Sequence, residues 1–270
     1  MGVYAVLGAT GNCGKALIKD LLRPSSSEPN TIHAYCRNKA KLYRVLPEVI
    51  DNKHIQIFDG SIQDVQLFAD CLRGVQTAFL VVSSNDNIPG CTLAQDTARI
   101  VVEALMRLKE EHEIEDDEAA FQPPKLVLLS SASVDPSLSL NMPWWFRPIM
   151  FRAASNVYED LRVTEVYLRR QEDWLTTIYV KPGGLAVDEA KGHRLTLTEE
   201  ESFLSYADLS AGMIEAALDA KDQYDGKSVG VVHRRKGDGA AFPWLTPVVI
   251  TMGLLRHFFP WLHAYLPMYG

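Results

Sequence analysis

The sequence has few of the features that secreted, metal-binding or nucleic-acid-binding proteins need. Its four cysteines have no Cys-x-x-Cys spacing and its histidines no metal-ligand spacing, so we expect free thiols and no metal. The 27 Lys and Arg residues are outnumbered by 34 Asp and Glu, and this balance argues against nucleic acid or an anionic membrane as the main partner. The start of the chain lacks a secretory signal pattern, and free thiols fit a reducing compartment, so a cytoplasmic location is expected.

The strongest functional signal lies in the first twenty residues. Val3 to Leu7 is predicted to be a short strand that ends on Gly8, and two more glycines follow at steps of three before an apolar-periodic segment. Such a loop lets the backbone approach a phosphate and directs free N–H groups at it from a helix N-terminus. Ordinary turns also contain glycines, but the flanking strand and helix favour a dinucleotide site. The loop residues predicted to bind the cofactor are Gly8, Thr10, Gly11, Asn12, Cys13 and Gly14.

The residue after the second strand, predicted at 31–36, bears on the choice of dinucleotide. An acidic side chain there favours a free ribose 2′-hydroxyl, whereas an arginine favours a 2′-phosphate. This chain has Arg37, followed by Lys39 and Lys41, with no carboxylate before Glu48. We therefore predict that Arg37 and Lys41 favour NADP(H) over NAD(H). The alternative is that they are solvated cations at a helix start.

Further apolar runs at residues 54–58, 76–82, 125–129 and 175–180 alternate with helical segments. This alternation predicts an α/β fold with a doubly wound, Rossmann-like parallel sheet and a small C-terminal substrate-binding part. We expect residues 1–180 to form the NADP(H)-binding domain, and residues 181–270 a substrate or lid region packed on it as one structural unit. Further cofactor contacts are predicted at the strand ends, from Asp59, Gly60, Ser61, Val82, Ser83, Ser84, Ser130, Pro182 and Gly183.

A long amphipathic helix is predicted from Thr92 onwards, because the apolar positions between Leu93 and Leu108 recur at three and four. Residues 110–118 then hold seven acidic side chains in nine, and we predict a solvated loop there. Because this run precedes a strand, it lies at the amino ends of the parallel strands, opposite the ligand crevice at their carboxyl ends. We therefore assign it no catalytic role.

Two apolar segments are candidates for the substrate side. Residues 142–151 are predicted to form a loop, and we expect this loop to cover a flat, hydrophobic ligand. The alternative is that its tryptophans pack in the core or in a dimer interface. Its substrate residues are predicted to be Trp144, Trp145, Phe146, Arg147 and Phe151. Residues 240–270 carry an apolar stripe interrupted by Pro260, and their Arg and His residues argue against a spanning helix. For this segment we rank closing the pocket first, pairing with another subunit second and lying on a membrane surface third.

Three further patterns join the glycine loop and Arg37: Tyr158-x-x-x-Arg162 with Glu165, KPGGL at 181–185 and FLSYADLSA at 203–211. With these features the chain resembles the NmrA-like branch of the atypical short-chain dehydrogenase/reductase superfamily over about residues 3–233. The C-terminal part and the aromatic loop look most like fungal members of the averufin-oxidase type, which are associated with polyketide secondary metabolism.

The resemblance implies roles for three residues. In the superfamily a serine after the fifth strand polarises the reacting oxygen, a tyrosine transfers the proton, and a lysine four residues later lowers the pKa of the tyrosine. By position, Ser131 (or Ser130 or Ser133) is the polariser and Tyr158 the acid/base, and Arg162 replaces the lysine. An arginine keeps the charge but is bulkier and planar. The alternative is that Tyr158 only packs and Arg162 forms a surface pair with Glu165.

These features together predict an NADPH-dependent oxidoreductase that acts on a hydrophobic, aromatic, polyketide-like small molecule. One alternative is an isomerase, cyclase or dehydratase on the same fold, and another is a regulatory protein that senses NADP(H). No nucleic acid or metal is expected, and a homodimer stays open. The aromatic loop favours a small-molecule pocket over a sensor.

Overall fold

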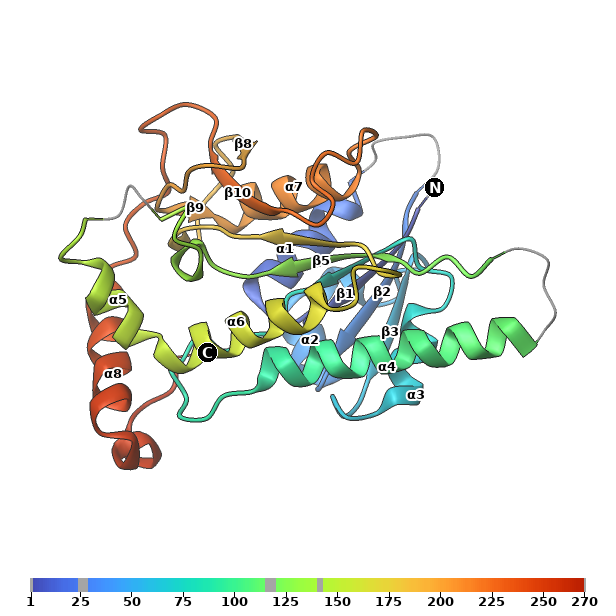
Figure 1. Ribbon diagram of the computed structural model, residues 1–270, viewed down its shortest axis with the longest axis horizontal. Helices are drawn as coiled ribbons and strands as arrows, with labels where there is room; N and C mark the ends of the chain where they lie inside the picture. The colour runs from blue at the N-terminus through green and yellow to red at the C-terminus, as the bar shows by residue number, and fades with distance from the viewer. Residues whose placement is uncertain (1, 24–28, 115–119, 140–142, 270) are drawn as a thin grey trace.

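The computed structural model describes residues 2–23, 29–114, 120–139 and 143–269, and its centre is a sheet of eight strands (Figure 1). Every neighbouring pair is parallel except the last, which is antiparallel. The doubly wound, Rossmann-like fold is therefore confirmed. In spatial order the strands are β3 (Ile55–Asp59), β2 (Thr31–Cys36), β1 (Val3–Leu7), β4 (Thr77–Leu80), β5 (Lys125–Leu129), β6 (Thr177–Val180), β10 (Ser228–His233) and β8 (His193–Thr196).

Helices cover both faces of this sheet, because the central strands are apolar on both sides. In β1, Tyr4 and Val6 join the core cluster shared with α1 (Asn12–Leu21) and α7 (Tyr206–Ala217). Ala5 and Leu7 face the opposite cluster, which α3 (Val65–Leu72), α4 (Leu93–Ile114) and α6 (Ser155–Arg169) help to form. The remaining elements are α2 (Lys39–Val45), η1 (Pro47–Val49), η2 (Ala132–Val134), α5 (Arg147–Ala153), β7 (Leu185–Ala186), β9 (Leu204–Ser205), α8 (Thr246–Phe258) and η3 (Pro260–Tyr265).

Two local predictions were wrong. The acidic run does not begin as a loop, because α4 continues to Ile114; residues 115–118 lie outside the described residues. Arg73 and Arg107 pair with Glu111 at 2.8 and 3.2 Å, and these ion pairs offset the repulsion among the carboxylates. Within the predicted loop 142–151, α5 begins at Arg147 with Pro148 in its first turn, a position where proline suits a helix. Met142 lies outside the described residues.

The C-terminal third does not form a separate layer. It supplies β10 and β8 to the main sheet, and its α7 packs against α1. After Asp238 the chain runs to α8, which lies beside α5 at one end of the molecule (Figure 1). Pro260 separates α8 from η3, as the interrupted stripe predicts. No helix among the described residues is long and apolar enough to span a bilayer.

Candidate functional site

The glycine loop between β1 and α1 is held by close backbone contacts. Gly8 has a φ of +110°, a conformation that favours glycine, and its N–H donates to the Tyr35 carbonyl at 3.2 Å. A Cβ at Gly14 would collide with the Gly8 carbonyl, so α1 can begin this close to the loop only with glycine there. The first turn of α1 carries no acidic residue, and its N-cap, Gly11, has no side-chain cap. The N–H groups at this helix start therefore remain available to an anion.

We expect Gly14→Ala to lower the free energy of unfolding by about 1–3 kcal/mol, because the added methyl group forces the helix away from the loop. Gly11→Ala is the matched control, since a Cβ there meets a single neighbouring atom, the Gly8 carbonyl oxygen at 3.4 Å. Its cost should stay below about 1 kcal/mol. Thermal unfolding of both variants measures this difference. Equal melting temperatures would show that the close approach of loop and helix is unimportant.

The loop lies in a cleft of about 720 Å³ at the carboxyl ends of β1, β2 and β4. The carboxyl ends of parallel strands are where ligands bind in this class of fold. The cleft brings together nine of the residues that the sequence predicts: Gly8, Thr10, Gly11, Asn12, Arg37, Lys41, Val82, Ser83 and Ser84.

Three cations border this cleft, namely Lys15, Arg37 and Lys41. Arg37 directly follows β2, and the side chain of Asn38 accepts the N–H of Lys41 at 2.9 Å, which fixes the start of α2. Sequence reasoning missed Lys15, which lies one turn into α1 and outside the glycine spacing. Two carboxylates, Asp86 and Asp96, also line the cleft, so the cations outnumber them, which suits a phosphorylated ligand.

Eight other predicted cofactor residues are not among those that line the cleft. Cys13 is buried beneath the loop with its Sγ 3.7 Å from the Met213 Sδ, and burial raises the pKa of its thiol to about 12. It therefore fills space and is inert at neutral pH. Gly14 supports the loop from below, as described above. The others are Asp59, Gly60, Ser61, Ser130, Pro182 and Gly183.

The hydroxyls of two of the predicted catalytic residues share one hydrogen-bonded group. The Tyr158 hydroxyl donates to the Ser133 Oγ at 3.2 Å, and it also interacts with the Ser131 hydroxyl. Burial raises the pKa of Tyr158, and these serine contacts lower it by less. The ring of Phe151 packs edge-on against Tyr158, with the ring centres 5.6 Å apart. Tyr158 is thus a half-buried, protonated phenol beside two hydroxyls and an aromatic ring.

The expected pair of Tyr158 and Arg162 is not formed. The Arg162 side chain is exposed and makes two hydrogen bonds, of 2.8 and 2.7 Å, to the Glu159 carboxylate. Glu165 faces the interior instead and does not form the alternative surface pair with Arg162. The reason is that a carboxylate three residues away on the same helix face draws the guanidinium toward solvent.

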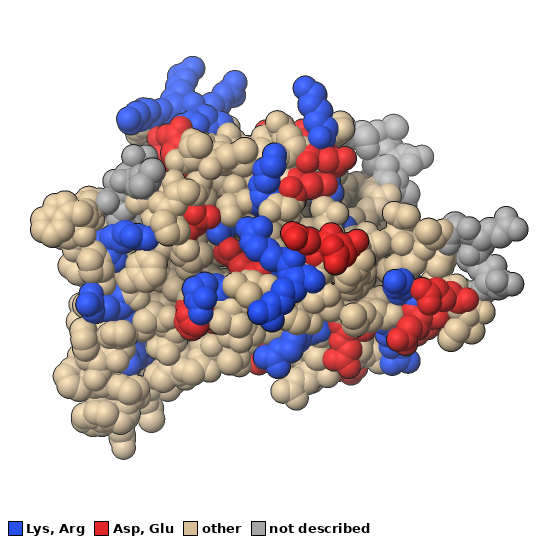
Figure 2. Space-filling model, in the orientation of Figure 1, with Lys and Arg blue, Asp and Glu red and all other residues tan. Residues whose placement is uncertain are grey.

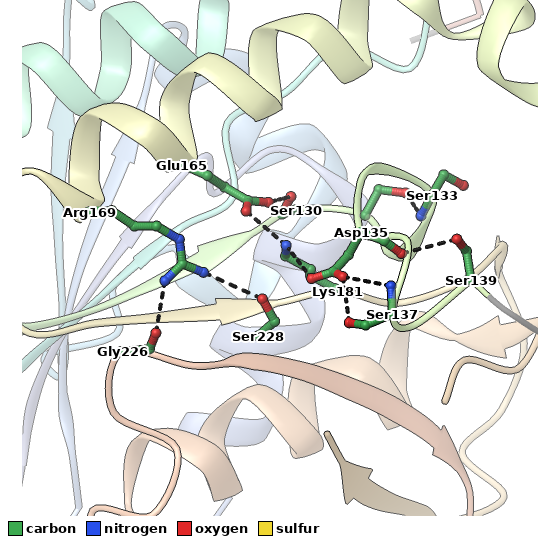
Figure 3. Close-up of polar contacts among 11 residues, drawn as sticks. Ser130, Ser133, Asp135, Ser137, Ser139, Glu165, Arg169, Lys181, Gly226 and Ser228 are labelled. Atoms are coloured by element: carbon green, nitrogen blue, oxygen red, sulfur yellow. Dashed lines mark hydrogen bonds and ion pairs between the residues drawn. The ribbon is translucent and has the colours of Figure 1, made fainter. Parts of the chain in front are cut away.

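A buried charge network that the sequence did not reveal holds the serine segment in place (Figure 3). Lys181 follows β6, is 3% exposed and pairs with Glu165 at 2.8 Å and Asp135 at 2.9 Å. Ser130 donates to the other oxygen of Glu165 at 2.5 Å, so this hydroxyl is held by a buried carboxylate. Asp135 follows η2, so Lys181 ties the segment of Ser131 and Ser133 to β6.

The pKa of Asp135 reflects this network. Burial raises it, but the hydrogen bonds from Ser137 and Lys181 together outweigh burial and hold the pKa well below the ordinary range. Figure 3 shows the Lys181 ammonium between the two carboxylates, with Ser137 and Ser139 on the far side of Asp135. Asp135 is therefore charged at neutral pH and attracts the lysine.

The predicted aromatic residues are divided between two places. Trp144 is 86% exposed and Trp145 57%, and the structure does not bring either of them to the cleft. Phe146 packs edge-on against Trp145, with ring centres 5.6 Å apart. Phe151 contacts Tyr158, and the Arg147 guanidinium lies 5.2 Å from the centre of the Phe151 ring. Arg147 and Phe151 are thus the substrate candidates next to the phenol.

The C-terminal residues form part of the cleft wall, which the sequence did not predict residue by residue. Met268 and Tyr269 line the cleft, and the Tyr269 N–H donates to the carboxylate oxygens of Asp86 at 3.0 and 3.2 Å. Arg256 in α8 is 1% exposed and pairs with the same carboxylate at 3.3 Å. The tail is therefore tied to the residues that follow β4.

Comparisons with known proteins agree with this geometry. The model of a family described as NAD(P)H-binding matches residues 8–220. An oxidoreductase of Pestalotiopsis microspora is 54% identical over 100% of this chain and 99% of its own length. One of Aspergillus fumigatus is 53% identical over 99% of this chain and 97% of its own.

A solved structure shares the fold. A short-chain dehydrogenase/reductase from Veillonella parvula, solved in complex with NADP, superposes with a TM-score of 0.66 at 18% identity and covers 89% of this chain and 99% of its own. Among the described residues, no group of three or more His, Cys, Asp or Glu side chains is placed to hold a metal ion. The match over residues 8–220 and the two fungal relatives establish that this chain belongs to the NAD(P)H-binding family.

Proposed function

We propose that the protein is an NADPH-dependent oxidoreductase that acts on a hydrophobic, aromatic, polyketide-like small molecule. The observation that carries this proposal is the half-buried Tyr158 phenol, which is hydrogen-bonded to Ser133. Tyr158 lies on α6, and a hydrogen bond connects α6 to the wall of the cleft. The Asn156 N–H donates to the Asn87 side chain at 2.8 Å, and Asn87 directly follows Asp86, which lines the cleft. Fungal relatives of this chain are oxidoreductases, which supports the reaction class.

The cleft residues fit a dinucleotide. Glycines stand where a Cβ would collide with backbone, the uncapped start of α1 offers N–H groups to a pyrophosphate, and Arg37 and Lys41 follow β2, where a ribose 2′-phosphate binds in this fold. When bound, NADPH supplies a hydride to an acceptor carbon of the substrate.

The chain's own groups supply the proton and the orientation. Tyr158 stays protonated at neutral pH, because burial raises its pKa, and it donates its proton to the substrate oxygen. Ser131 and Ser133 hold the phenol in place, and Lys181 holds their segment through Asp135. The Phe151 ring, beside the phenol, offers an apolar face to an aromatic substrate.

We expect Arg37→Ala to weaken NADPH binding by about 10–100-fold and to leave the Kd for NADH nearly unchanged. The reason is that charge-assisted hydrogen bonds are worth about 1.5–3 kcal/mol, and NADH lacks the 2′-phosphate. Lys53→Ala is the control, because Lys53 is exposed and precedes β3 at the opposite edge of the sheet. Fluorescence titration gives both constants. Equal losses for the two dinucleotides would remove Arg37 from the 2′-phosphate role.

A non-redox reaction, such as isomerisation, cyclisation or dehydration, is the second candidate. The surface position of Arg162 favours this candidate. In the reductases that the sequence resembles, a lysine four residues after the tyrosine supports proton transfer, whereas here Tyr158 would act as an acid/base without a cation at that position. Incubation with NADPH and a panel of anthraquinones and xanthones distinguishes the two. We expect loss of the nicotinamide absorbance together with products that have gained two hydrogens. An altered product that has kept its mass or lost only water, with the nicotinamide absorbance unchanged, would establish the non-redox reaction instead, and no product at all would favour the regulatory alternative.

A further inference from the structure

The C-terminal helix α8 is mostly apolar, and the protein covers it only in part. Its sequence, TPVVITMGLLRHF, has a single arginine, and Gly253 and Arg256 are its only buried residues. The aliphatic side chains between Val248 and Leu255 are each half-buried. A helix that is apolar all round normally lies inside a protein or in contact with lipid. The outer side of α8 is therefore suited to an apolar environment.

Large aromatic side chains are exposed at both ends of the paired helices α5 and α8. Four of the five tryptophans of the chain are among them, and the exposed fractions reach 86% for Trp144, 69% for Trp261 and 81% for Tyr265. Figure 1 shows α5 and α8 side by side at one end of the molecule, with η3 below them. We define the aromatic end as Trp144, Trp145, Phe151, Phe258, Phe259, Trp261 and Tyr265.

The segments that carry the aromatic end contain no carboxylate. Residues 136–158 and 239–270 lack Asp and Glu altogether, although the whole chain has 34 of them and a net charge of −7. Their cations are Arg147, Arg152 and the buried Arg256, and Arg152 is exposed. In the view of Figure 2 this end of the molecule is mostly tan, with blue side chains. The exposed Arg152 and the half-buried Arg147 thus supply positive charge beside exposed aromatic rings, with no carboxylate in the same segments.

This surface is held firmly against the rest of the chain. Gly253 lets α8 approach the Ala153 backbone so closely that a Cβ there would collide with the Ala153 carbonyl. The Asn87 side chain donates to the Gly253 carbonyl at 3.1 Å, and Ser155 and His257 are hydrogen-bonded at 2.8 Å. The buried Arg256–Asp86 pair adds a further tie. The exposed side of α8 is therefore a stable surface of the fold.

We propose that the aromatic end binds the surface of an anionic lipid bilayer. Trp and Tyr rings favour the headgroup level of bilayers, and each nearby Arg contributes about 1 kcal/mol of attraction to anionic lipid. A second copy of the chain fits less well. A two-fold interface places the same patch on both sides, so Arg152 would face a surface whose segments offer no carboxylate.

This inference reverses the order that the sequence suggested for residues 240–270. The tail does line the cleft through Met268 and Tyr269, so the end of the segment contributes to the pocket. Among the described residues, the rings that stay exposed are Phe258 at the end of α8 and Phe259, Trp261 and Tyr265 after it. An orientation with this end on lipid would bring the cleft close to a reservoir of hydrophobic small molecules.

Flotation of the full-length protein with vesicles tests the proposal. Wild-type protein should float with vesicles of phosphatidylcholine and phosphatidylserine, and much less with phosphatidylcholine alone or at high salt, since screening weakens charge attraction. Trp261→Ser/Tyr265→Ser should lower the bound fraction by about tenfold or more, because interfacial binding scales with inserted apolar area. Val187→Ser/Leu218→Ser is the matched control; Val187 and Leu218 are 83% and 56% exposed and lie outside the aromatic end.

Two further measurements keep the result clear. NADPH titration checks that each variant is folded, and brominated lipids should quench the tryptophan fluorescence of the unmodified protein, which needs no substitution. The proposal is overturned if wild-type protein does not float, or if both double variants float equally well. Sedimentation of the wild-type protein and of Trp261→Ser/Tyr265→Ser tests the alternative occupants. The proposal is also overturned if the wild-type protein forms a dimer, or a complex with another acidic protein, that the double variant no longer forms, and if brominated lipids do not quench its tryptophan fluorescence.

Discussion

Tyr158→Phe is expected to lower kcat by about 10²–10⁴-fold while the Kd for NADPH stays the same. The substitution removes the hydroxyl that donates to Ser133 and leaves the ring packed on Phe151. The cleft residues are untouched, since Tyr158 is not among those lining it. Tyr167→Phe on the same helix is the control, because its ring packs against the core cluster on the other side. A variant that retained full turnover would remove Tyr158 from the reaction.

The pH dependence of this reaction follows from the raised pKa of Tyr158. In the proposed reaction the phenol donates a proton, so it must be protonated, and burial keeps it so at every pH below its raised pKa. The rate of reduction should therefore stay level through neutral pH and fall only above about pH 10, the ordinary value for tyrosine. A fall near pH 7 would indicate that another group supplies the proton.

Lys181→Met is expected to lower the free energy of unfolding by about 3–5 kcal/mol, a loss of about 10 °C in Tm. It leaves Glu165 and Asp135 buried without their cation. Lys125→Met is the matched control. Lys125 also contacts two carboxylates at 2.8 Å, but Asp222 is 68% exposed, so its loss should cost about 1 kcal/mol or less. Similar melting temperatures for the two variants would contradict the structural role of the Lys181 network.

The same network gives the wild-type protein a pH dependence of known sign. The pKa of Asp135 is depressed in the folded state, so its contribution to stability is present above the unfolded value near 4 and is lost as the pH falls further. Lys181→Met removes the attraction that depresses this pKa. The variant should therefore lack this part of the acid destabilisation, which melting curves between about pH 2 and 6 measure directly.

The fold and the cofactor cleft were predictable because their signals are local in sequence. A buried parallel strand is a continuous apolar run, as VYAVL in β1 shows. The glycine loop directly follows β1 and Arg37 directly follows β2, so the position of each in the cleft follows from the strand beside it. Pro260 ends α8 by its own stereochemistry, since it has no N–H to donate.

The catalytic surroundings were less predictable because they depend on contacts between distant residues. Lys181 is next to Asp135 only after folding, and the pattern KPGGL alone gives no indication of its partners. The spacing of Tyr158 and Arg162 places both on one helix face, but Glu159 competes for the guanidinium at the surface. Likewise, the sequence predicts that the tryptophans near α5 cover the substrate. Their exposure in the structure depends on how α5 packs against α8, which the sequence does not indicate.

The most direct test of the proposed reaction uses NADPH deuterated at the transferable position of the nicotinamide C4. We predict that one product from the anthraquinone and xanthone panel carries the deuterium at carbon, that NADP⁺ forms in equal amount, and that Tyr158→Phe forms far less of both. Turnover that gives an unlabelled product with no NADP⁺ would contradict hydride transfer and establish the non-redox alternative.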